Sequence, residues 1–466
     1  MQQMDLLARL PLAEGVFRLW QASLPDERLG VIYEQHRGRC YEKKISFPLV
    51  VQLLADALCQ YGGSGRASFE HSAESRESVA SIQAFYGKLR RLPIEVSEAF
   101  LAEGSRWLRE LYPAAAAREL PSCLRAFEVL IVDGKAIKRV AKRLKVTRGR
   151  AGGVLGGRAL VCLSMRSGLA VAMAGHPDGE INDVRLVPQL LPQVRSRLRG
   201  PRLWVEDRAF CDLKQPALFC EEGDQFLVRH HQRLQFRVDT KRPSGCGQDA
   251  EARQWVEDWG WVGGANDQRR RRVRRIRLKL APQEQLVLLT SLLDAERYPA
   301  VALLEVYRQR WGIERVFQLV TEVFGLEGLI GSSAQASVFQ LAFCLELYNS
   351  VQVLRGYVAA GNHCQAEQLS MEKLFVDVER ELIAWSVLGR VRETVEWLAQ
   401  PRSLKQCRQR LRQRVGVLWE DRWKKSPPQK RRCHPSRGHA PGKHTSVFRI
   451  VEEYRRRSKI NRRHDE

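Results

Sequence analysis

The sequence Val129-Leu130-Ile131-Val132-Asp133-Gly134 joins a short apolar run to an acidic residue and a glycine. Four consecutive apolar residues bounded by turn-forming residues are typical of a strand buried on both faces. A second run, Leu203-Trp204-Val205, also ends in acidic residues, Glu206 and Asp207. The fold prediction starts from these two strands, because each carries a carboxylate at its end.

The segments around these strands predict a mixed sheet with helices. Residues 159–164 and 169–174 are apolar and flank Ser167-Gly168, which predicts a β-hairpin. The other expected elements are helices over 182–199 and 213–221 and a strand over 226–228. Neighbouring strands followed by alternating helix and strand indicate an α/β fold on a mixed sheet.

The rest of the chain divides into three kinds of sequence. Residues 1–120 have the apolar spacing of helices. Residues 121–400 form the α/β domain, interrupted at 230–297 by a β-rich insertion whose basic strand, 269–279, is expected to pair with 285–290. The last 66 residues hold 21 Lys and Arg against 6 Asp and Glu, and we expect this basic tail to be mobile unless a polyanion orders it.

The charge of the whole chain favours a polyanionic partner over simple solubility. The net charge is +24, from 77 Lys and Arg against 53 Asp and Glu, which fits nucleic acid or an anionic membrane. Residues 338–354 are the most apolar long segment, but Gln340, Glu346 and Asn349 interrupt it, so it predicts a buried helix and not a membrane span. Eleven cysteines form no CxxC pair, and Asp5 precedes the first apolar run, so we expect a reduced, cytoplasmic protein.

Three carboxylates are candidates for one site. Asp133 and Asp207 end strands, and ligands of α/β folds gather at strand ends, although Asp after a strand is also a good turn former. Glu206 competes with Asp207, but adjacent strand residues point to opposite faces, so only one can join the site. Tyr307, Arg310 and Glu314 follow a helical i, i+3, i+7 spacing that places them on one face, where a surface salt bridge is the plainer interpretation.

The segment containing Tyr307-x-x-Arg310-x-x-x-Glu314 resembles the signature of DDE-type insertion-sequence transposases of the Tyr-Arg-Glu-Lys class. Residues 131–135 resemble the strand with the first Asp of this family, and residues 204–210 resemble the strand with the second. Residues 288–299 resemble the segment before the signature helix. The likeness covers about 125–355, and the span from Asp207 to Glu314 leaves room for the β insertion of this class.

This resemblance implies a ribonuclease H-like core and a cut-and-paste DNA transposase. Asp133, Asp207 and Glu314 would be the catalytic residues and would bind Mg²⁺, for which Mn²⁺ substitutes, with Asp133 as the bridging ligand. Carboxylates suit this task because Mg²⁺ prefers hard oxygen ligands. Water would be the first nucleophile and the freed 3′-hydroxyl the second, by in-line displacement with two cations.

The implied partner is double-stranded DNA, both the transposon ends and the target, and no membrane partner is expected. The protein would act as a homodimer on DNA, in the cytoplasm at the nucleoid. Residues 1–120 would be the DNA-binding domain that recognises the ends. Basic residues over 135–150 and in the tail would hold phosphates, which positions DNA without reading its sequence. The individual DNA contacts expected are Tyr307, Arg310, Arg315, Thr321, Lys135, Arg208, Arg274, Arg275 and Arg277.

One departure from the signature keeps alternatives open. The family has a Lys seven residues after the Glu, where this chain has Thr321. A Lys there would hold a phosphate as a point charge, whereas Thr offers a hydrogen bond, so Arg315 or the basic insertion would have to supply the charge. The alternatives are a catalytically decayed, transposase-derived DNA-binding protein and another ribonuclease H-like nuclease.

Two further groups of residues have open roles. His176, Glu180 and Asp183 lie between the first two aspartates and either assist the site or cap the helix expected from Asn182. Hairpin-forming members of the family hold a flipped base with an aromatic residue of the insertion. Trp255, Trp259 and Trp261 are the candidates for that role, and core packing is the alternative.

Overall fold

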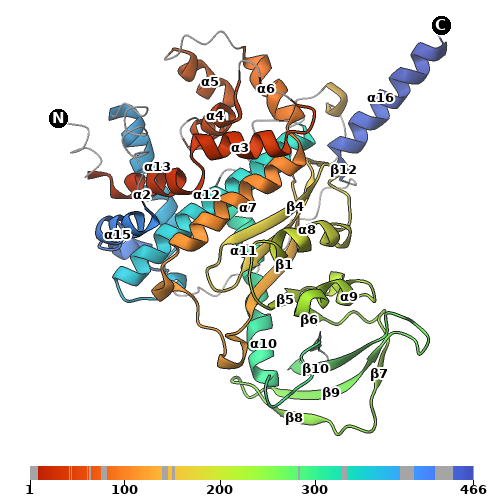
Figure 1. Ribbon diagram of the computed structural model, residues 1–466. Helices are drawn as coiled ribbons and strands as arrows, with labels where there is room; N and C mark the ends of the chain where they lie inside the picture. The colour runs from red at the N-terminus through yellow and green to blue at the C-terminus, as the bar shows by residue number, and fades with distance from the viewer. Residues whose placement is uncertain are drawn as a thin grey trace.

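The computed structural model describes residues 9–40, 42, 45–59, 61, 64–74, 81–138, 145–148, 153–281, 284–324, 326, 333–388, 403–425 and 444–464. Within them, one mixed sheet runs through the centre and helices pack around it (Figure 1). Its strands follow the order β4-β3-β1-β5-β6-β11-β10-β9-β7, and β8 pairs with β9. The predicted mixed α/β class is confirmed.

The first five strands of this order make the core half of the sheet. They are β4 (Ala170–His176), β3 (Arg158–Ser164), β1 (Glu128–Ala136), β5 (Arg202–Glu206) and β6 (Gln225–Arg229). β1, β3 and β4 are antiparallel, which confirms the predicted hairpin, whereas β1, β5 and β6 run parallel. This arrangement is consistent with a ribonuclease H-like core.

The register of β1 and β5 brings two predicted site residues together. Val132 pairs with Glu206 in this parallel ladder. Asp133 and Asp207 directly follow this last pair along β1 and β5, so both lie where the β1–β5 ladder ends, at the same edge of the sheet. Glu206 itself is buried, which agrees with the expectation that adjacent residues face opposite ways.

The insertion continues the core sheet. Its strands are β7 (Phe236–Val238), β8 (Gly245–Gln248), β9 (Gln254–Val262), β10 (Arg271–Ala281) and β11 (Glu284–Thr290). β10 and β11 pair antiparallel, as predicted for 269–279 and 285–290. β11 also pairs antiparallel with β6, so the insertion is hydrogen-bonded directly to the core.

Arg274 belongs to the interior of this insertion. Its side chain has no exposed surface and lies on the inward side of β10 with Ile276 and Leu278. The guanidinium pairs with Glu257 of β9 and donates to the Tyr298 carbonyl at 2.6 Å. The expectation that Arg274 contacts DNA is therefore corrected: this arginine holds the insertion together, and a basic strand pattern alone does not show which face is covered.

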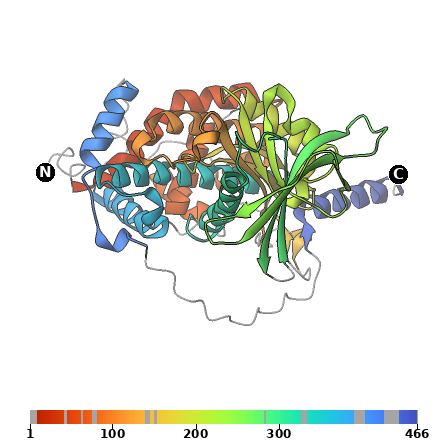
Figure 2. The same cartoon turned by 90° about the horizontal axis from the view of Figure 1, so that it is seen from below.

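A long helix, α12 (Ala334–Gly361), runs beside α7 (Ile94–Leu111) and packs against β4 (Figures 1 and 2). α12 is buried along almost its whole length, which confirms the buried helix predicted over 338–354. Its polar residues serve the edge strand: Asn349 accepts from the Ala170 N–H and donates to the Ala170 carbonyl, both at 2.8 Å. No described helix is long and apolar enough to cross a membrane.

The N-terminal helices share their core with α12. Phe47 of α4 and Phe100 of α7 both contact Phe339 of α12, with ring centroids 5.4 Å apart in each pair. The remaining N-terminal helices are α2 (Pro11–Ser23), α3 (Asp26–His36), α4 (Phe47–Cys59), α5 (Gly65–Glu74) and α6 (Ile82–Arg91). These helices therefore belong to the same packed body as the sheet.

The later helices are α8 (Val187–Arg195), α9 (Gln215–Phe219), α10 (Ala300–Arg308), α11 (Gly312–Glu322), α13 (Met371–Leu388), α15 (Leu404–Arg414) and α16 (Val447–His464). α8 begins later than the expected Asn182, because a 3-10 turn, η4 (Asp183–Arg185), comes first. α15 buries Cys407 and Leu411. The described residues of the tail, 403–425 and 444–464, thus contain regular secondary structure, and part of it packs against the body.

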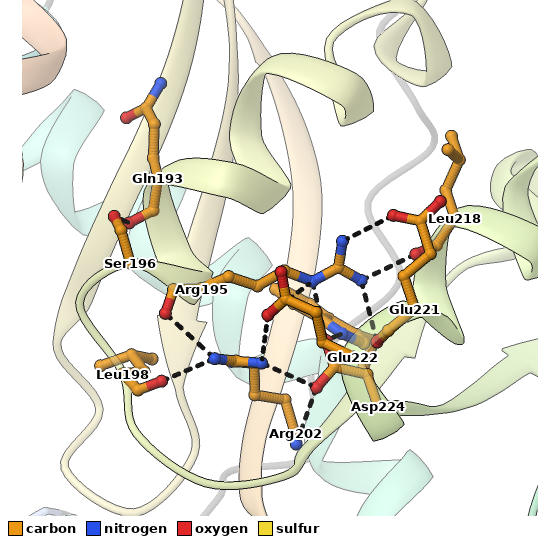
Figure 3. Close-up of polar contacts among 10 residues, drawn as sticks. Gln193, Arg195, Ser196, Leu198, Arg202, Leu218, Glu221, Glu222 and Asp224 are labelled. Carbon is orange, nitrogen blue, oxygen red and sulfur yellow. Dashed lines mark hydrogen bonds and ion pairs between the residues drawn. The ribbon is translucent and has the colours of Figure 1, made fainter.

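A buried carboxylate fixes the start of β5 (Figure 3). Asp224 is fully buried and accepts from the Arg202 backbone N–H at 3.1 Å and from its guanidinium at 2.9 Å. It also accepts from Arg195 of α8 and from the Trp204 indole, each at 3.0 Å. Because α8, β5 and β6 meet on this one side chain, the strand that carries Asp207 at its far end cannot slide.

We predict that Asp224→Ala lowers the free energy of unfolding by about 3–5 kcal/mol, because it leaves two arginines buried without their shared counter-ion. The measurement is urea unfolding followed by circular dichroism. Glu222→Ala is the matched control: Glu222 lies 3.5 Å from Arg202 but is 60% exposed, so its removal should change stability by less than about 1 kcal/mol. Equal losses in the two variants would contradict this account.

Candidate active site

One buried guanidinium lies among the three predicted carboxylates. Arg310 is 3.6 Å from Asp133 Oδ2, 4.0 Å from Asp207 Oδ1 and 3.3 Å from Glu314 Oε1, measured from its Nη atoms. The arginine side chain is 3% exposed, whereas the carboxylates are 22%, 31% and 45% exposed in the same order. The three acids therefore converge, with a cation behind them and solvent in front.

Each carboxylate comes from a different element. Asp133 lies near the end of β1, where its Oδ1 accepts from the Gly134 backbone N–H at 2.8 Å. Asp207 follows β5 and precedes the 3-10 turn η5 (Arg208–Phe210). Glu314 lies in the first turn of α11, where an acidic side chain is favoured by the helix dipole.

The helix expected across Tyr307, Arg310 and Glu314 is interrupted. A 3-10 turn, η7 (Gln309–Trp311), separates α10 from α11 and carries Arg310. The tyrosine ring is buried, with its centroid 5.9 Å from the Arg310 guanidinium carbon. Both side chains are buried in this arrangement, and their contacts with DNA remain predictions. A residue that the sequence did not suggest, Arg118, donates to the Gln309 side chain at 3.0 Å and so supports the turn.

The electrostatics of the site follow from this burial. Burial raises the pKa of Asp133 to about 6, and the neighbouring Asp183 and Glu314 raise it as well, while the Gly134 N–H and Arg310 act in the opposite direction. Burial alone would lower the pKa of Arg310, but the surrounding carboxylates and the tyrosine leave it raised. The arginine is therefore charged at any working pH, and the Asp133 carboxyl takes up a proton more readily than an ordinary aspartate.

A second cation lies beside the acids. Lys135, two residues beyond Asp133 on β1, donates from Nζ to Thr321 Oγ1 at 2.7 Å and to the Phe317 carbonyl at 3.3 Å. Both acceptors are on α11, the helix of Glu314. Thr321 occupies the position where the family signature has a lysine. Its hydroxyl accepts from the ammonium group of a different lysine, Lys135.

Asp183 lies against the other side of Asp133. A side chain at Gly134 would collide with the Asp183 carboxylate, which occupies the position that a Cβ atom would take. Arg158 of β3 holds this carboxylate through two nitrogens, one of them at 2.6 Å. The glycine after the first aspartate is therefore required by close packing, and of the open roles for Asp183 the structure supports one beside the site.

The other predicted DNA contacts divide by exposure. Arg208 and Arg315 are exposed and flank Asp207 and Glu314. Arg275 and Arg277 both pair with Asp258 of β9, at 2.7 and 2.8 Å, so part of their charge is already compensated. Of the basic stretch 135–150, residues 139–144 and 149–150 lie outside the described residues.

The tryptophans of the insertion and the site differ in environment. Trp259 is buried, donates to the Leu293 carbonyl at 2.7 Å and packs against the Arg242 guanidinium. For this residue the structure supports core packing. Trp311, by contrast, is 56% exposed beside Arg310, 4.9 Å from ring centroid to guanidinium. Trp311 lies off the i, i+3, i+7 face of Tyr307, Arg310 and Glu314, and its place between Arg310 and Glu314 is the sequence signal that points to it.

Residues 125–350 match the family of the transposase DDE domain. The match supports a DDE-type transposase, with the transposition, recombination, endonuclease and metal-binding properties of that family, and it implies DNA as substrate. It begins just before β1 and ends within α12, so it contains all three carboxylates and Arg310. No curated protein matches the chain.

The acids suit divalent cations shared with a substrate. Among the described residues, no three His, Cys, Asp or Glu side chains lie closely enough to enclose a metal ion by themselves. Mg²⁺ does not need such a cage, because it keeps several waters and takes one or two carboxylates together with substrate phosphates. One Nη atom of Arg310 lies within 4.0 Å of both Asp207 and Glu314 and the other lies 3.6 Å from Asp133, so the three carboxylates surround a single guanidinium.

We predict that binding of Mn²⁺ weakens as the pH falls through about 6, by about tenfold for each further pH unit, because the cation must then displace the proton of Asp133. Above that pH the carboxylate is already ionised, so the affinity should level off. Calorimetric titration across this range measures the effect, and Asp133→Asn should flatten the curve. An affinity that is unchanged below and above this pH would contradict the placement of Asp133 in the cation site.

Proposed function

We propose that this protein is a cut-and-paste DNA transposase that cleaves DNA at insertion-sequence ends and transfers the freed strands into a target. The observation that carries the proposal is the convergence of Asp133, Asp207 and Glu314 on Arg310 from β1, β5 and α11. The family match over this segment supports the same function. We further propose that it acts as a homodimer on double-stranded DNA, at the nucleoid in the cytoplasm.

The three carboxylates would hold two Mg²⁺ ions, or Mn²⁺ in their place, with Asp133 shared between them. When bound, such ions activate the attacking oxygen and stabilise the leaving oxygen. Arg310 holds the acids close together, and the Gly134 N–H orients Asp133 through its Oδ1. Exposed Arg208 and Arg315 are placed to hold DNA phosphates on either side of the acids.

Lys135 supplies a positive charge close to Thr321, the position whose missing lysine raised the alternative of a decayed copy. That alternative arose from the missing signature lysine at Thr321, yet the ammonium of Lys135 lies 2.7 Å from the Thr321 hydroxyl. A cation is therefore present on the Glu314 helix face, supplied by β1.

We predict that Glu314→Ala abolishes Mg²⁺-dependent nicking of a labelled duplex with the terminal repeat, while the affinity for that duplex changes less than about threefold, since Glu314 carries no positive charge to a phosphate. Nicking assays and fluorescence anisotropy measure the two quantities. Glu322→Ala, an exposed acid at the end of the same helix, is the control and should nick normally. Parallel loss of affinity and nicking in Glu314→Ala would make the residue structural.

We also predict that Lys135→Thr lowers the nicking rate by about 10- to 100-fold, the effect of removing one charge-assisted phosphate contact of about 1.5–3 kcal/mol. The exchange variant Lys135→Thr/Thr321→Lys should recover most of the rate, because it returns an ammonium to the same place from the other element. A single variant that nicks at the normal rate, or an exchange that recovers nothing, would show that the charge has no role there.

A further inference from the structure

The C-terminal helix α16 leaves the surface of the protein after its first turns (Figures 1 and 2). Val447 and Ile450 are buried, whereas the five consecutive residues Glu453–Arg457 are all exposed. Five residues of an α-helix cover more than a full turn. No face of α16 therefore packs on the described body at this point, and the helix continues outward to His464.

The root of α16 is attached near the carboxylate site. β12 (Thr445–Ser446) pairs parallel with β2 (Val154–Leu155) just before the helix. Arg449 then binds Asp178 at 2.8 Å and Glu180 at 2.6 Å. These two acids lie on the loop after β4 that leads to Asp183, the residue packed over Gly134. The direction of the helix is thus set by residues connected to the catalytic edge of the sheet.

The outward part of α16 is strongly basic. The helix holds seven Lys and Arg against two Glu. At 100° per residue, the helix positions of five basic residues fall within one arc of about 120°. They are Arg455, Arg456, Lys459, Arg462 and Arg463. An isolated helix of this length is only marginally stable in water, so a partner that binds this arc would also stabilise the helix.

We propose that α16 is a basic arm that binds the phosphates of a DNA duplex whose scissile phosphate lies at the three carboxylates. The proposal rests on the proposed function for its DNA substrate and adds a contact surface outside the matched segment, 125–350. A major groove about 12 Å wide admits an α-helix, and phosphates line both sides of it. A second copy of the chain is a poorer partner for this arc, because two arms of the same strong charge repel each other.

The test compares two variants of the full chain with equal loss of charge. The arm variant replaces the five arc residues with Gln. The control variant replaces Arg125, Arg166, Arg199, Lys373 and Arg380 with Gln. The first three lie at the end of the sheet opposite the carboxylates and the last two belong to α13, away from α16 (Figures 1 and 2). None of the five lies in a segment that the sequence predicts to contact DNA. Fluorescence anisotropy with a short labelled duplex of arbitrary sequence gives the affinity at several KCl concentrations between about 50 and 200 mM.

Each phosphate contact contributes about 0.9 to the slope of log affinity against log salt. We expect the arm variant to reduce this slope by about 3 to 4 and the affinity at 100 mM KCl by more than about tenfold. The control variant should keep the slope of the unmodified chain, and thermal unfolding should show that both variants are folded.

Equal slopes for the arm variant and the unmodified chain would overturn the proposal. A change of oligomeric state in the arm variant without DNA, seen by sedimentation, together with an unchanged slope, would assign the arc to a second copy instead. The two proposals can fail separately. If the unmodified chain nicks DNA but the arm variant keeps its salt slope, only this inference fails. If the unmodified chain neither binds nor nicks DNA, the proposed function fails as well.

Discussion

The guanidinium of Arg310 is surrounded by carboxylates that come from parts of the chain far apart in sequence. Like charges gathered at one place repel one another, and solvent screens this repulsion only in part because the three carboxylates are partly buried. Three such acids would therefore oppose a fold whose net stability is only about 5–15 kcal/mol. A buried cation within 4.0 Å of all three offsets that repulsion. The site can thus exist before any metal or DNA arrives, and its other features follow from holding this arginine in place.

Four supports hold the elements around Arg310. The parallel register of β1 and β5 places Asp133 and Asp207 at one edge, and Asp224 fixes the opposite end of β5. The 3-10 turn that carries Arg310 is supported by Arg118 from the segment before β1. The insertion joins the same sheet through β6 and β11. Positions in the site are therefore set by regular hydrogen-bonded elements, as accurate transfer chemistry requires.

The strands and the acids could be predicted from the sequence, because both are recorded in local patterns. A buried strand reads as a short apolar run, and Asp133 and Asp207 directly follow such runs. The helical spacing of Tyr307, Arg310 and Glu314 predicts the helix that carries Glu314, but it does not predict the 3-10 turn at Arg310. Such signals need no knowledge of what packs against the element.

What depended on distant partners could not be predicted. Arg274 is one arginine in a basic strand, and only the facing Glu257 of β9 shows that it points inward. The contact of Lys135 with Thr321 joins residues 186 positions apart. The tail looked mobile by composition, yet Val447 and Ile450 bury against the body. In each case the deciding neighbour is far away in sequence.

The central claim is that the carboxylates around Arg310 place divalent cations on the scissile phosphate. It is tested most directly with a duplex in which sulfur replaces one non-bridging oxygen of that phosphate. Mg²⁺ prefers oxygen, whereas softer Mn²⁺ tolerates sulfur better. The account predicts that nicking of the sulfur duplex falls at least about tenfold in Mg²⁺ and recovers in Mn²⁺. Equal nicking of the oxygen and sulfur duplexes in Mg²⁺, for both sulfur stereoisomers, would contradict it.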